Sequence, residues 1–160
     1  MDNKQSFSSN NLFSKIQEDL KFALKNQNQD DLRTLRFLLA EVNNQIAEKY
    51  SPQKGGIPVD GIPNEDIIQV IQKQVKTHKE SIEAFKAGHR QDLVTNEEKE
   101  LSILQKYLPP QISEEEIKKI IEEIKSSGIN DFGQIMKEVM AKVKGKADGS
   151  LVAKIVKESL

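Results

Sequence analysis

Isoleucine, leucine and valine recur every three or four residues along most of this chain, and this spacing constrains the fold more than any other feature. Such spacing places apolar side chains on one face of a helix. Hydrophobic residues make up only 36% of the 160 positions, and 31% are charged. Each helix therefore carries a narrow apolar stripe, and the pattern predicts an all-α protein built of slim helical bundles.

The proline pair Pro109–Pro110 is the strongest boundary in this pattern. A proline disfavours helical geometry at the residue before it, and the pair forms a short, stiff, extended spacer. We therefore expect two helical subdomains. An N-terminal bundle of about four helices should cover residues 12–108, and a C-terminal three-helix bundle residues 109–160. Residues 1–11 are polar, without the apolar segment of a secretory signal or the arginines of a mitochondrial one, and are expected to be a disordered tail.

Polar caps and breakers divide the N-terminal part into four predicted helices. The first begins at Leu12 after an asparagine N-cap and ends in a turn over residues 26–31, and the second runs from Leu32 to about residue 50. A proline- and glycine-rich connector over residues 51–63 follows, which Ile57, Val59 and Ile62 are expected to fix to the bundle. Asn64 is expected to cap the third helix, which stops at Gly88, and the fourth runs from Arg90 to Leu108.

The C-terminal part opens with a capping box, in which Ser113 and Glu116 satisfy each other's backbone amides. Its first helix should end at Gly128, and two further helices should meet at a short turn after Val143. The expected core of this subdomain consists of Ile120, Ile121, Ile124, Met136, Met140, Val152, Ile155 and Val156.

That short turn is the most distinctive charged feature of the chain. From Lys137 onward six lysines face only three acidic residues, although the whole chain has a net charge of −1. The glycines allow close approach of a phosphate, and the last helix offers amides at its N-terminus. The candidate binding residues are Lys142, Lys144, Gly145, Lys146, Gly149, Ser150 and Lys154. The alternative is structural: the glycines form the turn, Asp148 caps the last helix, and the lysines only aid solubility.

Other polar residues point to no chemistry. Without cysteine the chain has no disulfide, thiolate zinc site or cysteine nucleophile, which suits a cytoplasmic protein. His78 and His89 are too far apart along a helix to share a metal, and no third ligand is suitably spaced. The acidic run at residues 97–100 is expected to be a solvated face, and Arg33 and Arg36 are expected to shield the apolar stripe. We predict no catalytic residue, metal, cofactor or membrane segment.

Several segments in register resemble the GatB/YqeY family, in particular its stand-alone YqeY branch. They are AGHRQDL at 87–93, ELSILQKYLP at 100–109, SEEE at 113–116, GQIM at 133–136 and VKGKADG at 143–149, with the closing pair Ile155–Val156. The N-terminal segments at residues 23–25 and 32–36 also match. The resemblance implies two all-helical subdomains and a relation to the tail of the GatB amidotransferase subunit, which helps to hold tRNA. Two departures are Lys146, where the family commonly has arginine, and a longer connector after Tyr50.

Three functions follow as hypotheses. The first is a non-catalytic helical module that binds structured RNA, with tRNA as the favoured ligand. The second is a role as accessory to a carbon–nitrogen ligase with glutamine as amido-nitrogen donor, or only an inherited label for that activity, because the chain lacks a nucleophile motif and a phosphate loop. The third is a protein-interaction adapter with Met136 or Ile129 exposed to a partner helix. A tRNA amidotransferase or synthetase-type protein is the expected protein partner, and the sequence gives no oligomeric state.

Overall fold

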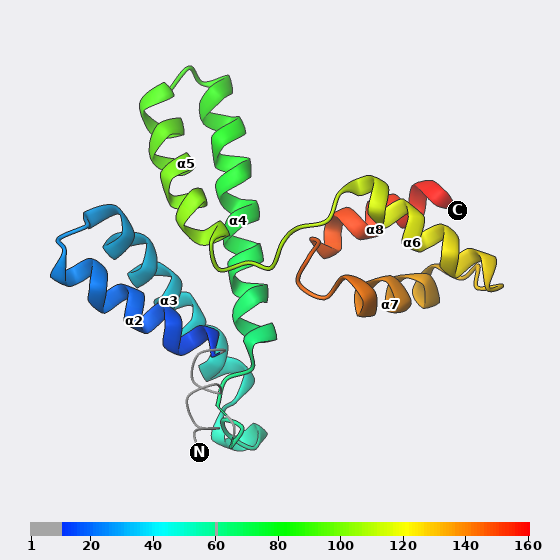
Figure 1. Cartoon of the computed structure of the whole chain (residues 1–160), viewed down its shortest axis with the longest axis horizontal. Helices are drawn as coiled ribbons and strands as arrows, with labels where there is room; N and C mark the ends of the chain where they lie inside the picture. Colours follow the sequence, from blue (N-terminus) through cyan, green and yellow to red (C-terminus); the bar gives the residue numbers. More distant parts are fainter. Residues whose placement is uncertain (1–10, 60) are drawn as a thin grey trace, which may run out of the picture. The chain divides into compact units, whose positions relative to one another are not determined.

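The computed structural model describes residues 11–59 and 61–160, and in these ranges it is all-α, as predicted (Figure 1). The helices are α2 (Leu12–Lys25), α3 (Gln29–Lys49), α4 (Asn64–Ala87), α5 (Gln91–Gln105), α6 (Glu114–Ser126), α7 (Phe132–Val143) and α8 (Gly149–Ser159), with a 3₁₀ turn, η1 (Pro52–Lys54). The chain divides into two compact units between Tyr107 and Leu108. The expected disordered tail lies outside the described residues, except for Asn11, which caps α2.

The N-terminal unit consists of two helical hairpins, α2–α3 and α4–α5 (Figure 1). Helix α3 packs against both members of the second hairpin, so the two hairpins share one core. The buried apolar residues of this unit are Ile16, Ala23, Leu32, Leu35, Leu38, Val42, Ile67, Val70, Ile71, Val75, Ile82, Val94, Ile103 and Leu104. Their three- and four-residue spacing is the one that the sequence shows.

The second helix begins earlier than its apolar stripe indicates. The prediction that residues 26–31 form a turn was wrong, because α3 starts at Gln29. The side chain of Asn28 accepts a hydrogen bond from the amide of Asp31, which makes Asn28 the N-cap. Asp30 and Asp31 then lie in the first turn, where carboxylates favour the helix dipole. The polar run is thus a helix start rather than a connection.

Two other boundaries also differ from the prediction. Asn64 is the first residue of α4 and does not cap it; its side-chain oxygen instead accepts a hydrogen bond from the amide of Leu12 at 2.9 Å. This contact joins the starts of α2 and α4. Helix α5 ends at Gln105, short of Leu108. The stop at Gly88 is as predicted.

The connector over residues 51–63 is held less firmly than expected. Ile57 and Val59 are strongly exposed, so the prediction that they fix it to the bundle was wrong. Ile62 is half-buried near the start of α4. The connection is anchored instead at its entry, where Lys49 and the Tyr50 hydroxyl both donate to the buried carboxylate of Asp66 on α4.

In the C-terminal unit each of α6, α7 and α8 packs against the other two. The capping box is present: Ser113 Oγ accepts from the Glu116 amide, and the Glu116 carboxylate accepts from the Ser113 amide. The core consists of Ile117, Ile121, Ile124, Ile135, Val139, Val143, Ala147, Val152, Ile155 and Val156. Met136 and Ile129 pack against this core and are only partly exposed, contrary to the exposure that a partner groove there requires.

Candidate functional site

The predicted cationic turn is the loop 144–148 between α7 and α8. Helix α7 ends at Val143, and Lys146 donates its amide back to the carbonyl of Val143 at 2.7 Å. Gly145 has a φ of +70°, a conformation that residues with a Cβ rarely adopt. Asp148 then caps α8 by accepting from the amide of Ser150 at 3.0 Å. These local signals produce the sharp reversal that the sequence indicates.

Contacts from the segment before α6 give this loop a fixed shape. The amide of Ile112 donates to the carbonyl of Lys146 at 3.0 Å, and the side-chain amide of Gln111 donates to the carbonyl of Gly145 at 3.0 Å. Ala147 is buried in the core of the unit. The loop is therefore held on both sides, and the lysines on it extend from a rigid base.

The lysines of the loop region are exposed. Lys142 lies 3.7 Å from Glu123, an ion pair between two well-exposed side chains. Lys144, Lys146 and Lys154 form no ion pair with any residue in the described ranges. Three cationic groups are thus available to an anionic ligand, and the fourth is held only by a weak surface pair.

The other candidate residues divide by role. Gly145 is required by its backbone conformation. Gly149 is not: it has no positive φ, and a Cβ there would meet only Met140 Cε at 3.7 Å, an ordinary contact. The amide of Ser150 donates to Asp148, so this N-terminal amide already has an acceptor. Any phosphate contact here therefore depends on the lysines more than on backbone amides.

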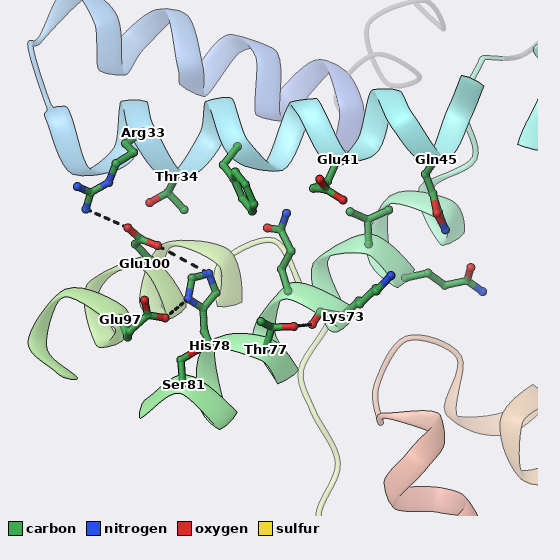
Figure 2. A pocket seen from close by; sticks show the side chains of 14 residues that line it. Arg33, Thr34, Glu41, Gln45, Lys73, Thr77, His78, Ser81, Glu97 and Glu100 are labelled. Carbon is green, nitrogen blue, oxygen red and sulfur yellow. Dashed lines mark hydrogen bonds and ion pairs between the residues drawn. The ribbon is translucent and has the colours of Figure 1, made fainter. Parts of the chain in front are cut away.

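A second polar site, which the sequence did not indicate, lies within the N-terminal unit (Figure 2). It is a slot of about 540 Å³ between α3, α4 and α5. Figure 2 shows Arg33, Thr34, Glu41 and Gln45 on the α3 wall, facing Lys73, Thr77, His78 and Ser81 of α4, with Glu97 and Glu100 of α5 at one end. Phe37, Gln69, Val70 and Gln74 complete the lining.

Charged groups at the α5 end of the slot form a connected chain. Arg33 lies 2.9 Å from Glu100, Glu100 lies 3.8 Å from His78 Nε2, and His78 Nδ1 lies 2.5 Å from Glu97. The expectation that residues 97–100 form a solvated face was therefore wrong for Glu97 and Glu100, whose side chains are only 23% and 22% exposed. Their spacing of three residues puts both on one helix face, which is the signal that could have revealed the pair.

His78, Glu97 and Glu100 also offer ligand atoms within 4.8 Å of one another, the spacing of a metal-ligand set. No third ligand near His78 was evident in the sequence because both glutamates come from another helix. In this arrangement the Arg33 guanidinium neutralises Glu100, and His78 already pairs with Glu97. The cluster therefore serves as an ion-pair network that links α3, α4 and α5.

Two tyrosine–carboxylate pairs hold the ends of this unit. Burial raises the pKa of Asp66, but hydrogen bonds from Lys49 and Tyr50 outweigh it and leave this pKa below the usual value of 3.8. The Tyr107 hydroxyl donates to Asp19 at 2.6 Å, and burial, followed by this bond, raises the pKa of Tyr107 above its usual range. Both tyrosines thus act as neutral donors that join distant helices.

These features define an all-α protein with a cationic loop in one helical unit and a polar slot in the other. The model of the YqeY family, described as Yqey-like protein, matches residues 13–160. The chain belongs to this family, as its sequence motifs indicated. No helix in the described part is long and apolar enough to cross a membrane.

Two kinds of relative are similar to this chain. Altered inheritance of mitochondria protein 41, mitochondrial, of Pyrenophora tritici-repentis is 32% identical over 155 residues, which cover 93% of this chain and 81% of that protein. A glutamyl-tRNA(Gln) amidotransferase subunit of Thermococcus gammatolerans is 33% identical over 114 residues, which cover 67% of this chain but 18% of that protein. The subunit of the same name from Saccharolobus solfataricus is 32% identical, with 70% and 18% covered.

Proposed function

We propose that this protein is a non-catalytic helical module that binds structured RNA, with tRNA as the favoured ligand. The observation that carries the proposal is the set of three exposed lysines without ion pairs in the described ranges, Lys144, Lys146 and Lys154, around a loop of fixed shape. Structured RNA is recognised largely through its backbone and shape, which a rigid cationic surface suits. The similarity to subunits named for glutamyl-tRNA(Gln) amidotransferase supports tRNA over other RNA.

The interface consists of Lys142, Lys144, Gly145, Lys146, Gly149, Ser150 and Lys154, with unequal roles. Lysines are point charges that neutralise phosphates without the paired geometry of arginine. Lys142 has to exchange Glu123 for a phosphate, whereas Lys144 and Lys146 bind directly. Gly145 sets the shape of the loop, and Asp148, by capping Ser150, keeps α8 in register with it.

Filter binding with total tRNA tests this proposal. If three lysines contact phosphates, the logarithm of the affinity should fall by roughly 2–3 for each tenfold rise in salt. The variant Lys142→Glu/Lys144→Glu/Lys146→Glu should lose binding and keep its helical content. The matched pair for charge is Lys144→Glu/Lys146→Glu against Lys118→Glu/Lys119→Glu, two exposed lysines of α6 in the same unit. Equal losses in both double variants would refute the loop as the binding site.

A second candidate is an accessory of a carbon–nitrogen ligase that uses glutamine as amido-nitrogen donor. The match covers about two thirds of this chain but less than a fifth of the subunits named for tRNA amidotransferase, so this chain corresponds to one part of a larger protein. As an accessory it would bring tRNA to a partner enzyme. Adding the chain to an amidotransferase assay at limiting tRNA should then raise the rate, and the triple lysine variant should not.

The proposed compartment is the cytoplasm, because a chain without cysteine has no disulfides to form. The name of the Pyrenophora relative carries a mitochondrial location. Fractionation of cells that express the untagged protein decides between the two.

A further inference from the structure

The slot between α3, α4 and α5 contains two buried polar atoms without a partner. Thr34 Oγ1 and Gln74 Nε2 have no hydrogen-bond partner among the described residues, and the two residues are only 4% and 8% exposed. Both line the slot. A buried unsatisfied group costs about 1–3 kcal/mol. Atoms left in this condition on opposite walls of one cavity indicate a ligand that supplies their hydrogen bonds.

The dimensions of the slot restrict what can enter. Its α3 wall runs from Arg33 to Gln45, twelve residues along a helix, which is about 18 Å. A volume of about 540 Å³ over this length leaves a mean cross-section of only about 30 Å². A helix with side chains is about 10–12 Å across and is too thick. The slot admits a planar ring or an extended group, and its volume lies within the range of small-molecule sites.

The lining favours a flat heteroaromatic ring. Phe37 lines the slot and is 59% exposed, so one side of its ring is available for stacking. Gln74 Nε2 is a donor, and the ring nitrogens of a purine are acceptors. A glutamine amide pairs well with adenine edges, and bases stack readily on aromatic side chains.

The charges of the lining disfavour a phosphate as the recognised group. Glu97 is paired with His78 and Glu100 with Arg33. Among the remaining lining residues, Glu41 opposes the charge of Lys73, so no net positive charge is left for an anion. This balance contrasts with the lysine loop of the other unit. The neutral base and sugar, rather than the phosphate, should therefore supply the binding free energy.

We infer that the slot between α3, α4 and α5 binds the nucleobase of a nucleoside, stacked on Phe37 and hydrogen-bonded to Thr34 and Gln74. The base comes either from a free nucleoside or from an unstacked position of an RNA strand, and the recognition chemistry is the same for both. This site is separate from the proposed phosphate contacts of the loop. It adds a sequence-reading element to a protein whose loop reads only backbone.

Titration of the full-length protein with adenosine, followed by two-dimensional NMR, tests the inference. Adenosine should shift amide resonances of α3 and α4 around Thr34, Phe37 and Gln74. AMP should bind no more tightly than adenosine. A short oligoadenylate that binds through the same residues more tightly than adenosine identifies RNA as the source of the base, and equal affinity identifies the free nucleoside. Absence of shifts up to the solubility limit of adenosine overturns the inference.

Matched variants separate the site from nonspecific binding. Phe37→Ala should weaken adenosine binding about 5- to 160-fold through lost stacking. Phe22→Ala, at a residue of α2 that is 69% exposed and lies outside the slot, should leave binding unchanged. Equal effects of these two changes contradict the site.

Gln74→Met should weaken adenosine binding about 2- to 13-fold and also raise the melting temperature, because it removes an unsatisfied donor at nearly constant volume. Gln17→Met, on the exposed side of α2, serves as its control. A Gln74→Met protein that is more stable but binds adenosine like the parent shows that the donor only meets water, and overturns the inference. The lysine-to-glutamate variants of the loop should bind adenosine normally, so failure of one proposal leaves the other testable.

Discussion

Thr34 is a buried threonine whose hydroxyl has no hydrogen-bond partner among the described residues. Valine has nearly the same shape and no polar atom, so Thr34→Val removes the unsatisfied group without leaving a cavity. We expect the change to raise the free energy of unfolding by about 1 kcal/mol. Urea denaturation measures it as a higher midpoint at constant slope.

The control for this change is Thr95→Val, because Thr95 is exposed and donates to the carbonyl of Gln91 in its own helix. Its midpoint should move little. A lower midpoint for Thr34→Val would mean that the hydroxyl is satisfied in solution, for instance by a bound water.

Asp66 connects the end of α3 to the start of α4 through Lys49 and Tyr50. Because its carboxylate is buried and accepts from both, Asp66→Asn should lower the free energy of unfolding by about 1–3 kcal/mol at neutral pH. The pKa of Asp66 lies below 3.8 in the folded state, since the two hydrogen bonds outweigh the effect of burial. Its stabilisation is therefore complete above the unfolded-state pKa and is lost as the pH falls through the folded-state pKa.

The cost of Asp66→Asn should accordingly be constant from neutral pH to about pH 5 and shrink toward zero below 3.8. Denaturant midpoints of parent and variant across this range measure it. Glu65→Gln, at the exposed neighbour on α4, provides the reference for a lost surface charge. A cost that does not depend on pH would contradict a role for the ionised carboxylate.

At the level of single residues the sequence was informative where the role is local. The capping of Ser113 and Asp148 and the left-handed turn at Gly145 depend on neighbours within a few residues, and all three were expected. The inward position of Glu97 and Glu100 depends on His78 and Arg33 from other helices. Only knowledge of which helices meet makes those carboxylates more than a solvated face.

The turn between α7 and α8 allows a test at the level of secondary-structure elements, because its two glycines differ. Gly145 has a φ of +70°, so Gly145→Ala should cost about 1–2 kcal/mol of stability. Gly149 is the first residue of α8, and alanine fits there, so Gly149→Ala should be neutral or add up to about 1 kcal/mol. Thermal unfolding of the two variants side by side measures this difference.

The same pair bears on RNA binding. If the lysines carry the affinity, Gly149→Ala should bind tRNA like the parent, whereas Gly145→Ala should bind more weakly because the loop changes shape. A loss with Gly149→Ala would instead show that the backbone at Gly149 approaches a phosphate closely, as expected from the sequence.

Helix boundaries show the same limit at this scale. Apolar spacing located the stripe of α3 correctly but not its start, because Asn28 caps a polar first turn that has no apolar residue. Asn64 has the residue type of an N-cap, yet it bonds to Leu12 of another helix. A cap residue can meet either partner, and the sequence does not distinguish them.

For the whole molecule, the all-α fold and the three-helix C-terminal unit followed from periodicity and from the family motifs. The slot did not, because it exists only where α3 crosses the α4–α5 hairpin and contains polar residues at positions that a stripe assigns to solvent. Buried polar atoms such as those of Thr34 and Gln74 break the pattern of the core. Such departures from sequence consistency are expected at functional sites.

The separate cores of the two units predict separate responses to core mutations. Ile121 is fully buried among residues of α6, α7 and α8, and Ile121→Ala should cost about 2–5 kcal/mol. A unit as small as residues 108–160 has little stability to lose, so this change should unfold it. Hydrogen exchange should then show lost amide protection in α6–α8 and retained protection in α2–α5. Leu38→Ala, in the N-terminal core, should produce the reverse pattern. If either change removed protection throughout the chain, the two units would fold as one cooperative structure, and the proposed boundary at Pro109 would not separate independent domains.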